Sequence, residues 1–241
     1  MNINSTCPFF MRDVYLYDIS ACHYSILREM NFDLSKLDKD DKTQRNIQIG
    51  LMMRERPELV NILRDITTST VSEHLTRNNI KEDDIVTRQY DGIILRRPLK
   101  NKNQEYLPLE LRSIYQTFII SSDRKSYMAF DGKEISIKGV SHKYEEMNEF
   151  MGRLVRMSYM NKTDIFKNLQ KLKDEFMGSD DPDLFCIPVG EGEYNIFVKG
   201  MGEVRITENM VNLLDVDEID RSRYFDFYLR PFTESICLEF A

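Results

Sequence analysis

Two Asp-Gly dipeptides, each set between runs of strand-forming residues, constrain the fold of this 241-residue chain most strongly. Asp91-Gly92 and Asp131-Gly132 are both typical of the tight turn of a β-hairpin. A hairpin joins antiparallel strands, so the sequence predicts antiparallel sheets. The strand-like runs around these turns are residues 84–90, 92–97, 126–130 and 134–138.

The rest of the chain alternates between strand and helix patterns. Residues 12–19 are almost continuously apolar or aromatic after Asp13, as in a strand covered on both faces. This order predicts an α+β fold with helices on one face of the sheet and a boundary near residue 140. The other predicted elements are helices at 20–30 (with Ser20 as N-cap), 42–56, 58–77, 143–160, 163–177 and 217–240 (kinked at Pro231), a strand at 111–121, and short strands within 184–206.

Composition excludes several classes of protein. The chain is 41% hydrophobic and 30% charged, which suits a folded domain with a core rather than a disordered segment. Its four cysteines are scattered and its three histidines lie far apart, which argues against a disulfide scaffold or a zinc site. No apolar run reaches the length of a membrane span, and residues 1–11 lack a secretion signal, so we expect a cytoplasmic protein.

The charge is unevenly distributed. The net charge is −7, which by itself argues against binding to nucleic acid. From residue 180 onward, however, fourteen acids face only five bases, whereas the first 179 residues carry 28 bases and 26 acids. A local basic face is therefore possible in the first three quarters of the chain, because the local field matters more than the total.

Two aspartates lie where predicted strands end. Asp18 leaves the first strand, and Asp91 lies between the next two. Carboxylates on neighbouring strands can together hold two Mg²⁺ ions, the arrangement used in phosphoryl transfer. Each acid also has a simpler interpretation, since Asp18 could cap the following helix and Asp91 could serve only the turn before Gly92.

Short motifs around these aspartates resemble, in order, the palm and thumb of family B DNA polymerases. The segment DISACHYSIL at 18–27 is similar to that family's D-x-x-S-L-Y-P-S-I-I motif, and KTQRNIQIG at 42–50 is similar to K-x-x-x-N-S-x-Y-G. Tyr90-Asp91 resembles the second half of Y-x-D-T-D-S. The further matches are K-x-Y at 125–127, K-G-V at 138–140 and a closing helix at 224–241.

The resemblance covers nearly the whole chain and implies a polymerase-like palm with shortened fingers (about 28–57) at 1–140 and a mostly helical thumb at 141–241. It implies template-directed DNA synthesis with two Mg²⁺ ions, primer–template DNA and a dNTP, in the cytoplasm or wherever the replicated genome resides. The family's N-terminal and exonuclease regions have no counterpart, which suggests a split polymerase with a second protein chain, as in a virus or mobile element. The implied metal ligands are Asp18 and Asp91; the implied nucleotide-binding residues are Ile19, Ser20, His23, Tyr24, Lys42, Arg45 and Asn46; and the implied DNA-binding residues are Arg64, Lys125, Tyr127 and Lys138.

The sequence also departs from the family pattern. Only Asp91 remains of the two acids in the third motif, and His23 stands where the family has its sugar-excluding tyrosine, with Tyr24 one residue later. Ile47 and Ile49 replace a serine and a base-stacking tyrosine. Two alternatives to an enzyme therefore remain open: a non-catalytic polymerase-like subunit that binds primer–template DNA or an active polymerase, and an α+β interaction domain with an acidic tail.

Overall fold

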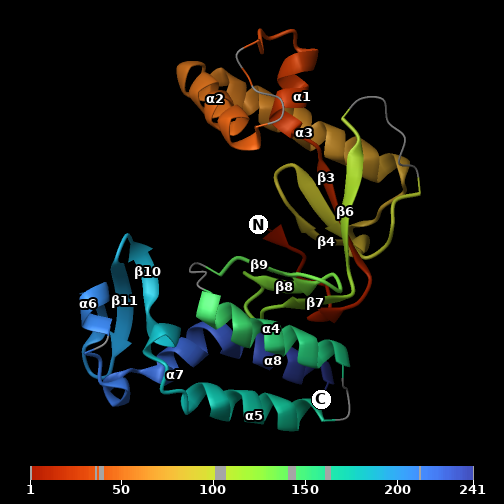
Figure 1. Ribbon diagram of the computed structural model, residues 1–241. Helices are drawn as coiled ribbons and strands as arrows, with labels where there is room; N and C mark the ends of the chain where they lie inside the picture. The colour runs from red at the N-terminus through yellow and green to blue at the C-terminus, as the bar shows by residue number, and fades with distance from the viewer. Residues whose placement is uncertain are drawn as a thin grey trace. The chain divides into compact units, whose positions relative to one another are not determined.

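The computed structural model describes residues 2–35, 37, 41–100, 107–140, 145–160, 164–211 and 213–240. The chain forms two compact units. Unit 1 comprises Met1–Cys7 and Asp13–Ile114, and unit 2 comprises Pro8–Arg12 and Tyr115–Ala241. Both combine helices with antiparallel sheets, as Figure 1 shows, which confirms the predicted α+β class.

The boundary between the units lies at residues 114–115 rather than near residue 140. The single strand predicted at 111–121 is two strands, β6 (Leu109–Tyr115) and β7 (Thr117–Ile120), which belong to different sheets. The hairpin β8 (Tyr127–Phe130) and β9 (Ile135–Lys138) pairs with β7 and shares its hydrophobic core with the later helices. This packing assigns the residues between 115 and 140 to unit 2.

Unit 1 is built on a five-stranded sheet with the order β1-β4-β5-β3-β6. Its central hairpin is the one predicted from Asp91-Gly92, and β3 pairs antiparallel with β5 along the register Tyr15 to Leu95 and Asp18 to Gly92. The strands in addition to β6 are β1 (Asn2–Ile3), β3 (Val14–Ile19), β4 (Ile85–Arg88) and β5 (Gly92–Leu95).

Three helices also belong to the described part of unit 1, and they match the sequence prediction closely. They are α1 (Cys22–Glu29), α2 (Lys42–Glu55) and α3 (Glu58–Arg77), with a 3₁₀ turn at Glu82–Asp84 before β4. Tyr17 and Ile93 from the sheet share one buried core with Leu63 of α3. Ser20 is not the N-cap of α1: that position is held by Ala21, whose backbone is left-handed with φ 47°, and which makes no side-chain cap.

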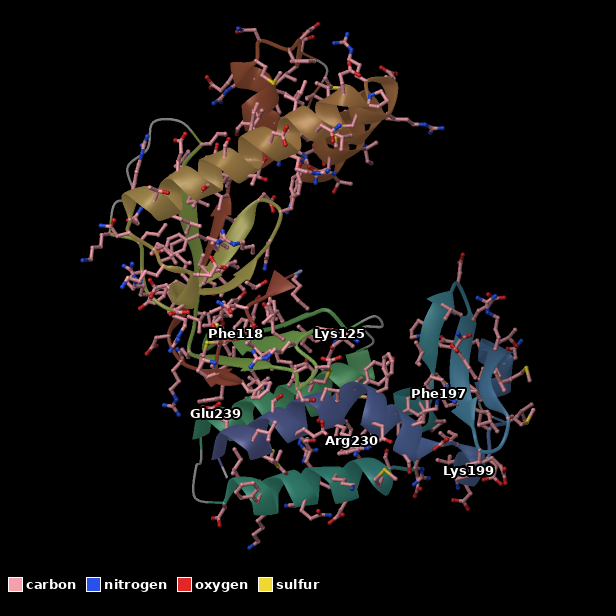
Figure 2. All side chains as sticks on the ribbon, turned by 180° about the vertical axis from the view of Figure 1, so that it is seen from behind. Phe118, Lys125, Phe197, Lys199, Arg230 and Glu239 are labelled. Carbon is pink, nitrogen blue, oxygen red and sulfur yellow. The ribbon has the colours of Figure 1, made fainter. Side chains whose placement is uncertain are left out.

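Unit 2 contains a four-stranded sheet, β2-β7-β8-β9, where β2 is Phe10–Met11. The helices α4 (Glu145–Met160) and α8 (Arg230–Phe240) contact β7, and α5 (Ile165–Met177) packs on α4 (Figure 1). Phe118 of β7, labelled in Figure 2, is fully buried and stacks on Tyr127 with ring centroids 4.6 Å apart. The residues at 141–144, where we predicted the start of a helix, lie outside the described part of the chain.

A separate three-stranded sheet completes unit 2. It consists of β10 (Ile187–Gly190), β11 (Glu193–Val198) and β12 (Gly202–Thr207), with α6 (Glu208–Val211) after it and 3₁₀ turns at Pro182–Phe185 and Val216–Glu218. The hydroxyl of Tyr224 joins this sheet to the helices, because it donates to the carbonyl of Phe185 and accepts from the backbone N–H of Phe197 at 2.8 Å.

The final helical region is irregular in the turn directly before Pro231, where the sequence predicted a kink. A short helix α7 (Arg221–Tyr224) leads into a π-helical turn, Phe225–Leu229, in which the N–H of Arg230 donates to the carbonyl of Phe225. Helix α8 continues this run from Arg230, so Pro231 cannot donate a hydrogen bond to the preceding turn, and the π-helical turn lies where a proline disturbs a helix. No helix in the described parts of the chain is long and apolar enough to cross a membrane.

Candidate active site

The pairing of β3 with β5 brings Asp18 and Asp91 to neighbouring positions at one end of the sheet in unit 1. Asp18 is the penultimate residue of β3 and lies opposite Gly92. The next backbone N–H along β3, that of Ile19, donates to the carbonyl oxygen of Asp91 at 2.9 Å. The two acids therefore meet across a single strand pair, as the sequence predicted.

Gly92 gives Asp18 the room it occupies. A Cβ added at Gly92 would lie 2.8 Å from the carbonyl oxygen of Tyr17 and 3.3 Å from Oδ1 of Asp18. The first distance is too short for real atoms, and its partner is backbone that cannot rotate away. Gly92 is therefore needed for two reasons: it suits the turn, and its lack of a side chain leaves space for the carboxylate of Asp18.

The carboxyl of Asp18 resists ionisation. Burial raises its pKa above the ordinary 3.8, and the nearby charge of Asp91 raises it further. The positive charges of Arg112 and Lys42 and the N–H of Ile19 act in the opposite direction without cancelling the rise. The pair of acids therefore carries an excess of negative charge that an added cation would relieve.

A cleft of about 760 Å³ opens in front of these two acids. One wall is the face of α2 on which Lys42, Arg45, Asn46, Ile49 and Gly50 recur at spacings of three and four residues, as one face of a helix requires. Asp41 caps this helix by accepting from the N–H groups of Thr43 and Gln44. The other lining residues are Asp18, Ile19, Ser20, Ala21, Cys22, His23, Tyr24, Met53, Asp91 and Arg112.

All the nucleotide-binding residues predicted from the sequence thus line one cleft, together with both predicted metal ligands. Tyr24 also contacts Arg45, whose guanidinium carbon lies 5.8 Å from the centre of the tyrosine ring. This cation–π contact fixes the long arginine side chain between α1 and α2. The cleft joins two carboxylates on the sheet to two cationic side chains on a helix.

Arg112 of β6 is the cleft residue that sequence reasoning missed. Its Nε lies 3.7 Å from Oδ2 of Asp18, its Nη1 lies 3.1 Å from Oε2 of Glu110, and its Nη2 donates to Oγ of Ser20. Ser20 in turn donates to Oε2 of Glu110 at 3.1 Å. The alternation of Glu110 and Arg112 with Leu109 and Leu111 is a strand signal that could have revealed both residues.

His23 forms part of the wall near Asp91. Its ring meets that of Tyr90 edge-on, with centroids 5.3 Å apart, and its Nε2 is buried without a hydrogen-bond partner. Burial lowers the pKa of His23, although Asp91 acts to raise it. The imidazole is therefore held neutral, and its Nε2 is the buried polar atom of this wall that lacks a partner.

Cys22, which also lines the cleft, is a structural residue. Its Sγ lies 3.2 Å from Oγ1 of Thr67, and that hydroxyl donates to the carbonyl of Leu63 at 2.7 Å, so the thiol is the donor to Thr67. Burial raises the pKa of Cys22 to about 11, which removes it as a nucleophile at neutral pH.

None of the four predicted DNA-binding residues is among the residues that line the cleft. Arg64 is exposed on α3, where its charge acts on the Tyr90 hydroxyl. Lys125 (Figure 2) and Lys138 are exposed in unit 2, and Gly139 lies so close to Lys125 that an added Cβ would meet its carbonyl oxygen at 2.3 Å. Tyr127 is 1% exposed, so its packing in the core does not favour the predicted contact with a primer strand.

The two carboxylates of the cleft suit a hard divalent cation whose other ligands are water and phosphate oxygens. Among the residues that the structure describes, no group of three or more His, Cys, Asp or Glu side chains could hold a metal. Mg²⁺, however, is commonly bound by one or two carboxylates together with water and phosphate oxygens. Asp18 and Asp91 provide that number of carboxylates, and Lys42 and Arg45 provide charge for phosphates.

A family model described as Bacteriophage PBS1 gene 130 protein matches residues 9–219, most of the chain. The chain belongs to the bacteriophage PBS1 gene 130 protein family. No curated protein matches it. For this member of the phage family, the matched range includes Asp18, Asp91, Glu110 and Arg112.

A solved structure supports the fold of this family member. The family B DNA polymerase from the hyperthermophilic archaeon Pyrobaculum calidifontis is similar at a TM-score of 0.51 and 12% sequence identity, over 95% of the present chain. The chain spans 45% of the length of that polymerase. At this identity the similarity shows a polymerase-like fold, in agreement with the α+β architecture.

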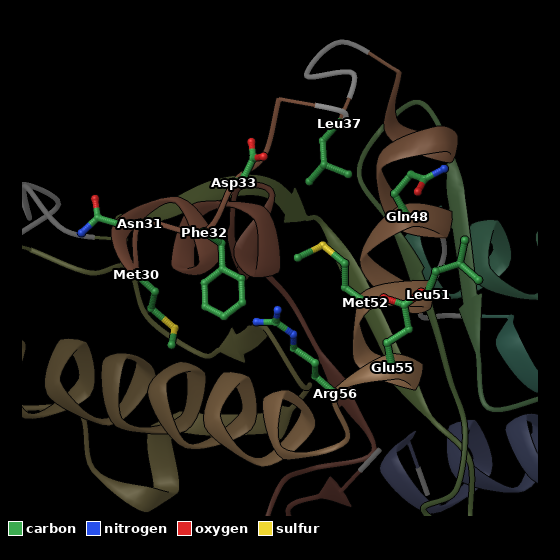
Figure 3. Close-up of a pocket in the computed structure, with 10 residues that line it drawn as sticks. All are labelled: Met30, Asn31, Phe32, Asp33, Leu37, Gln48, Leu51, Met52, Glu55 and Arg56. Carbon is green, nitrogen blue, oxygen red and sulfur yellow. The ribbon is translucent and has the colours of Figure 1, made fainter.

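A second cleft lies on another side of α2. It encloses about 660 Å³ between the end of α1, the segment after it and α2, and Figure 3 shows its lining. Arg56 points toward Phe32, with its guanidinium carbon 5.7 Å from the ring centre (Figure 3). Leu51 and Met52 add an apolar wall, while Asp33 and Glu55 are its acids. Neither Asp18 nor Asp91 lines this cleft.

Proposed function

We propose that this protein catalyses template-directed nucleotidyl transfer, as the palm and thumb part of a small or split DNA polymerase. The observation that carries the proposal is the 760 Å³ cleft in unit 1, which joins Asp18 and Asp91 to the cationic face of α2. The low-identity likeness to a family B DNA polymerase supports it through the fold. The phage family supports a viral setting.

Each side of the cleft has a distinct role in this proposal. Asp18 and Asp91 would hold Mg²⁺, and the bound metal would supply activation of a 3′-hydroxyl and charge stabilisation of the leaving pyrophosphate. Lys42 and Arg45 bind the triphosphate, because cations are the side chains that neutralise phosphate charge. Tyr24 and His23 border the sugar and base, and the backbone at Ile19 and Ser20 lies beside the phosphates.

The test is primer extension by the purified chain with primed DNA, four dNTPs and Mg²⁺. We expect extension by the natural chain and its loss, by about 10³-fold or more, in Asp18→Asn and Asp91→Asn, since each removes a metal-holding charge. Asp65→Asn is the control, because Asp65 is exposed on α3 and lies outside the cleft lining. Equal extension by Asp18→Asn and the natural chain would refute catalysis at this site.

A second candidate is a non-catalytic subunit that binds primer–template DNA. The observation that favours it is Arg112, whose guanidinium already neutralises part of the charge of Asp18. This candidate predicts salt-sensitive DNA binding without extension under any combination of Mg²⁺ or Mn²⁺. Binding assays on the same preparations, with the salt concentration varied, separate the two candidates. A second protein chain would then supply the catalytic function.

A further inference from the structure

Arg112 lies against Asp18 in the same cleft, beside one of the two carboxylates that would hold a divalent cation. Its Nε lies 3.7 Å from Oδ2 of Asp18, and it comes from β6, which neighbours β3 in the sheet. The side chains of Arg112 and Asp18 are 38% and 35% exposed, so both can be reached from the cleft. A guanidinium here is a resident positive charge at one of the two carboxylates.

Arg112 is not bound to Asp18 alone. The contact with Glu110 is shorter, at 3.1 Å, and Ser20 both accepts from Arg112 and donates to Glu110. Glu110 is absent from the residues that line the cleft, so it approaches Arg112 from outside the site. If the contact with Asp18 is lost, Arg112 therefore keeps a carboxylate and a hydroxyl as partners.

Asp18 can therefore be neutralised either by the guanidinium of Arg112 or by a metal ion. With Arg112 drawn toward Asp18, the carboxylate is neutralised from within the chain. With Arg112 held by Glu110 and Ser20, the Asp18 oxygens are available to a metal ion shared with Asp91. Both contacts of Arg112 are present together in the structure, and the contact with Glu110 is the shorter of the two.

We propose that Arg112 is a built-in competitor for divalent cations at the Asp18–Asp91 pair, and that Glu110 sets its strength by holding Arg112 away from Asp18. Glu110 and Arg112 are positioning residues here, because they act through Asp18. The inference rests on the proposed function, in that it takes Asp18 and Asp91 as the metal-holding carboxylates. It extends that function by naming the residues that control metal affinity.

The test measures Mn²⁺ binding to the full chain by electron paramagnetic resonance, after removal of bound metals with a chelator. Mn²⁺ is the probe because it shares the preference of Mg²⁺ for carboxylate oxygen and is detected directly. Arg112→Gln should bind Mn²⁺ about three- to tenfold more tightly than the natural chain, and Glu110→Gln more weakly by a similar factor. Arg77→Gln is the control, since Arg77 pairs with Glu73 at the far end of α3.

The double variant Glu110→Gln/Arg112→Gln separates the proposal from simple addition of charges. If Glu110 acts by holding Arg112, the double variant binds Mn²⁺ as tightly as Arg112→Gln alone. If the two charges act independently, their opposite effects cancel and the double variant resembles the natural chain, which overturns the proposal. Thermal melts without Mn²⁺ verify that each variant is folded.

Failure of this inference can be told apart from failure of the proposed function. Loss of Mn²⁺ binding in Asp18→Asn, with no change in Arg112→Gln, refutes the competitor role and leaves the metal-holding pair intact. Binding unaffected by Asp18→Asn and Asp91→Asn refutes the pair itself, and the competitor with it. Absence of Mn²⁺ binding in every variant, including Arg112→Gln, also overturns the proposal.

Discussion

Unit 1 contains two aspartate–arginine pairs that have opposite character. In the first, Oδ2 of Asp84 accepts from Nε of Arg97 at 2.8 Å and from the N–H of Lys81 at 3.0 Å. In the second, Asp18 faces Arg112 at 3.7 Å, with Asp91 beside it. Burial raises the pKa of both carboxyls, but Arg97 and Lys81 reverse the effect and lower the pKa of Asp84, whereas the charge of Asp91 adds to the rise at Asp18.

The comparison shows that an arginine neighbour alone does not define the role of an acid. The carboxylate of Asp84 accepts hydrogen bonds from Arg97 and from the backbone of Lys81, and Arg97 also donates to the carbonyl of Asn79. Asp18 shares an incompletely neutralised site with a second acid. The Asp84–Arg97 pair stabilises the start of β4. At Asp18 and Asp91, an added cation would neutralise the charge that Arg112 leaves.

The largest expected difference between the pairs is their response to a divalent cation. Mn²⁺ at about a hundred times its Kd should raise the free energy of unfolding by about 2.7 kcal/mol through binding at Asp18 and Asp91. Asp18→Asn should remove this stabilisation, and Asp84→Asn should retain it. Thermal melts of the three proteins with and without Mn²⁺ measure the effect. An equal shift in all three would mean that the cation binds elsewhere.

Gly92→Ala should disturb the Asp18 pair and leave the Asp84 pair intact. The added Cβ meets the carbonyl of Tyr17 at 2.8 Å, so we expect a loss of about 1–3 kcal/mol in the free energy of unfolding. Gly50→Ala is a matched substitution, because nothing lies within 4 Å of its added Cβ on helix α2. That variant should gain up to about 1 kcal/mol from helix propensity. Urea denaturation of both variants provides the comparison.

Replacing each aspartate by asparagine should change the free energy of unfolding differently in the two pairs. Asp84→Asn should lose about 1 kcal/mol of stability at neutral pH, because Arg97 keeps its carbonyl partner but loses its carboxylate. Asp18→Asn should be neutral or slightly stabilising without metal, since it removes the repulsion from Asp91. Asp83→Asn, at the exposed neighbouring position, is the control for a change of charge. A destabilised Asp18→Asn would contradict the comparison.

The smallest expected effect is the pH dependence of stability. Because the folded-state pKa of Asp84 lies below 3.8, its contribution is complete above the unfolded value and is lost as the pH falls through the lowered pKa. Asp18 has the opposite sign, because its pKa lies above 3.8 and protonation stabilises the folded state as the pH falls through it. Urea midpoints from pH about 7 to about 3, with Asp84→Asn and Asp18→Asn as references, test both signs.

Local signals predicted most of the fold and most of the candidate site. Helix α3 has the predicted bounds, Glu58–Arg77, because Pro57 and a long apolar face define it within one stretch of sequence. The Asp91-Gly92 turn carried enough information to place both acids at one end of the sheet. The predicted Mg²⁺ ions, dNTP and DNA contacts stay predictions.

The features that escaped prediction depend on distant parts of the chain. Ser20 and Glu110 are separated by 90 residues, and only the pairing of β6 beside β3 brings them together. The break of strand 111–121 after Tyr115 has the same cause, since β7 finds its partners β2 and β8 in another unit. Tyr127 matched a motif, yet its ring is committed to stacking on Phe118 in the core.

The assignment of residues 8–12 to unit 2 has a consequence for how this chain can be divided or recombined. The chain passes between the units near residues 7–8, 12–13 and 114–115, so no single cut separates them. A gene fragment that begins at residue 115 would lack β2 and leave β7 as an open edge, with the partners of Phe10 and Met11 unpaired. Such an edge invites pairing with another copy, so the two units are expected to be inherited together.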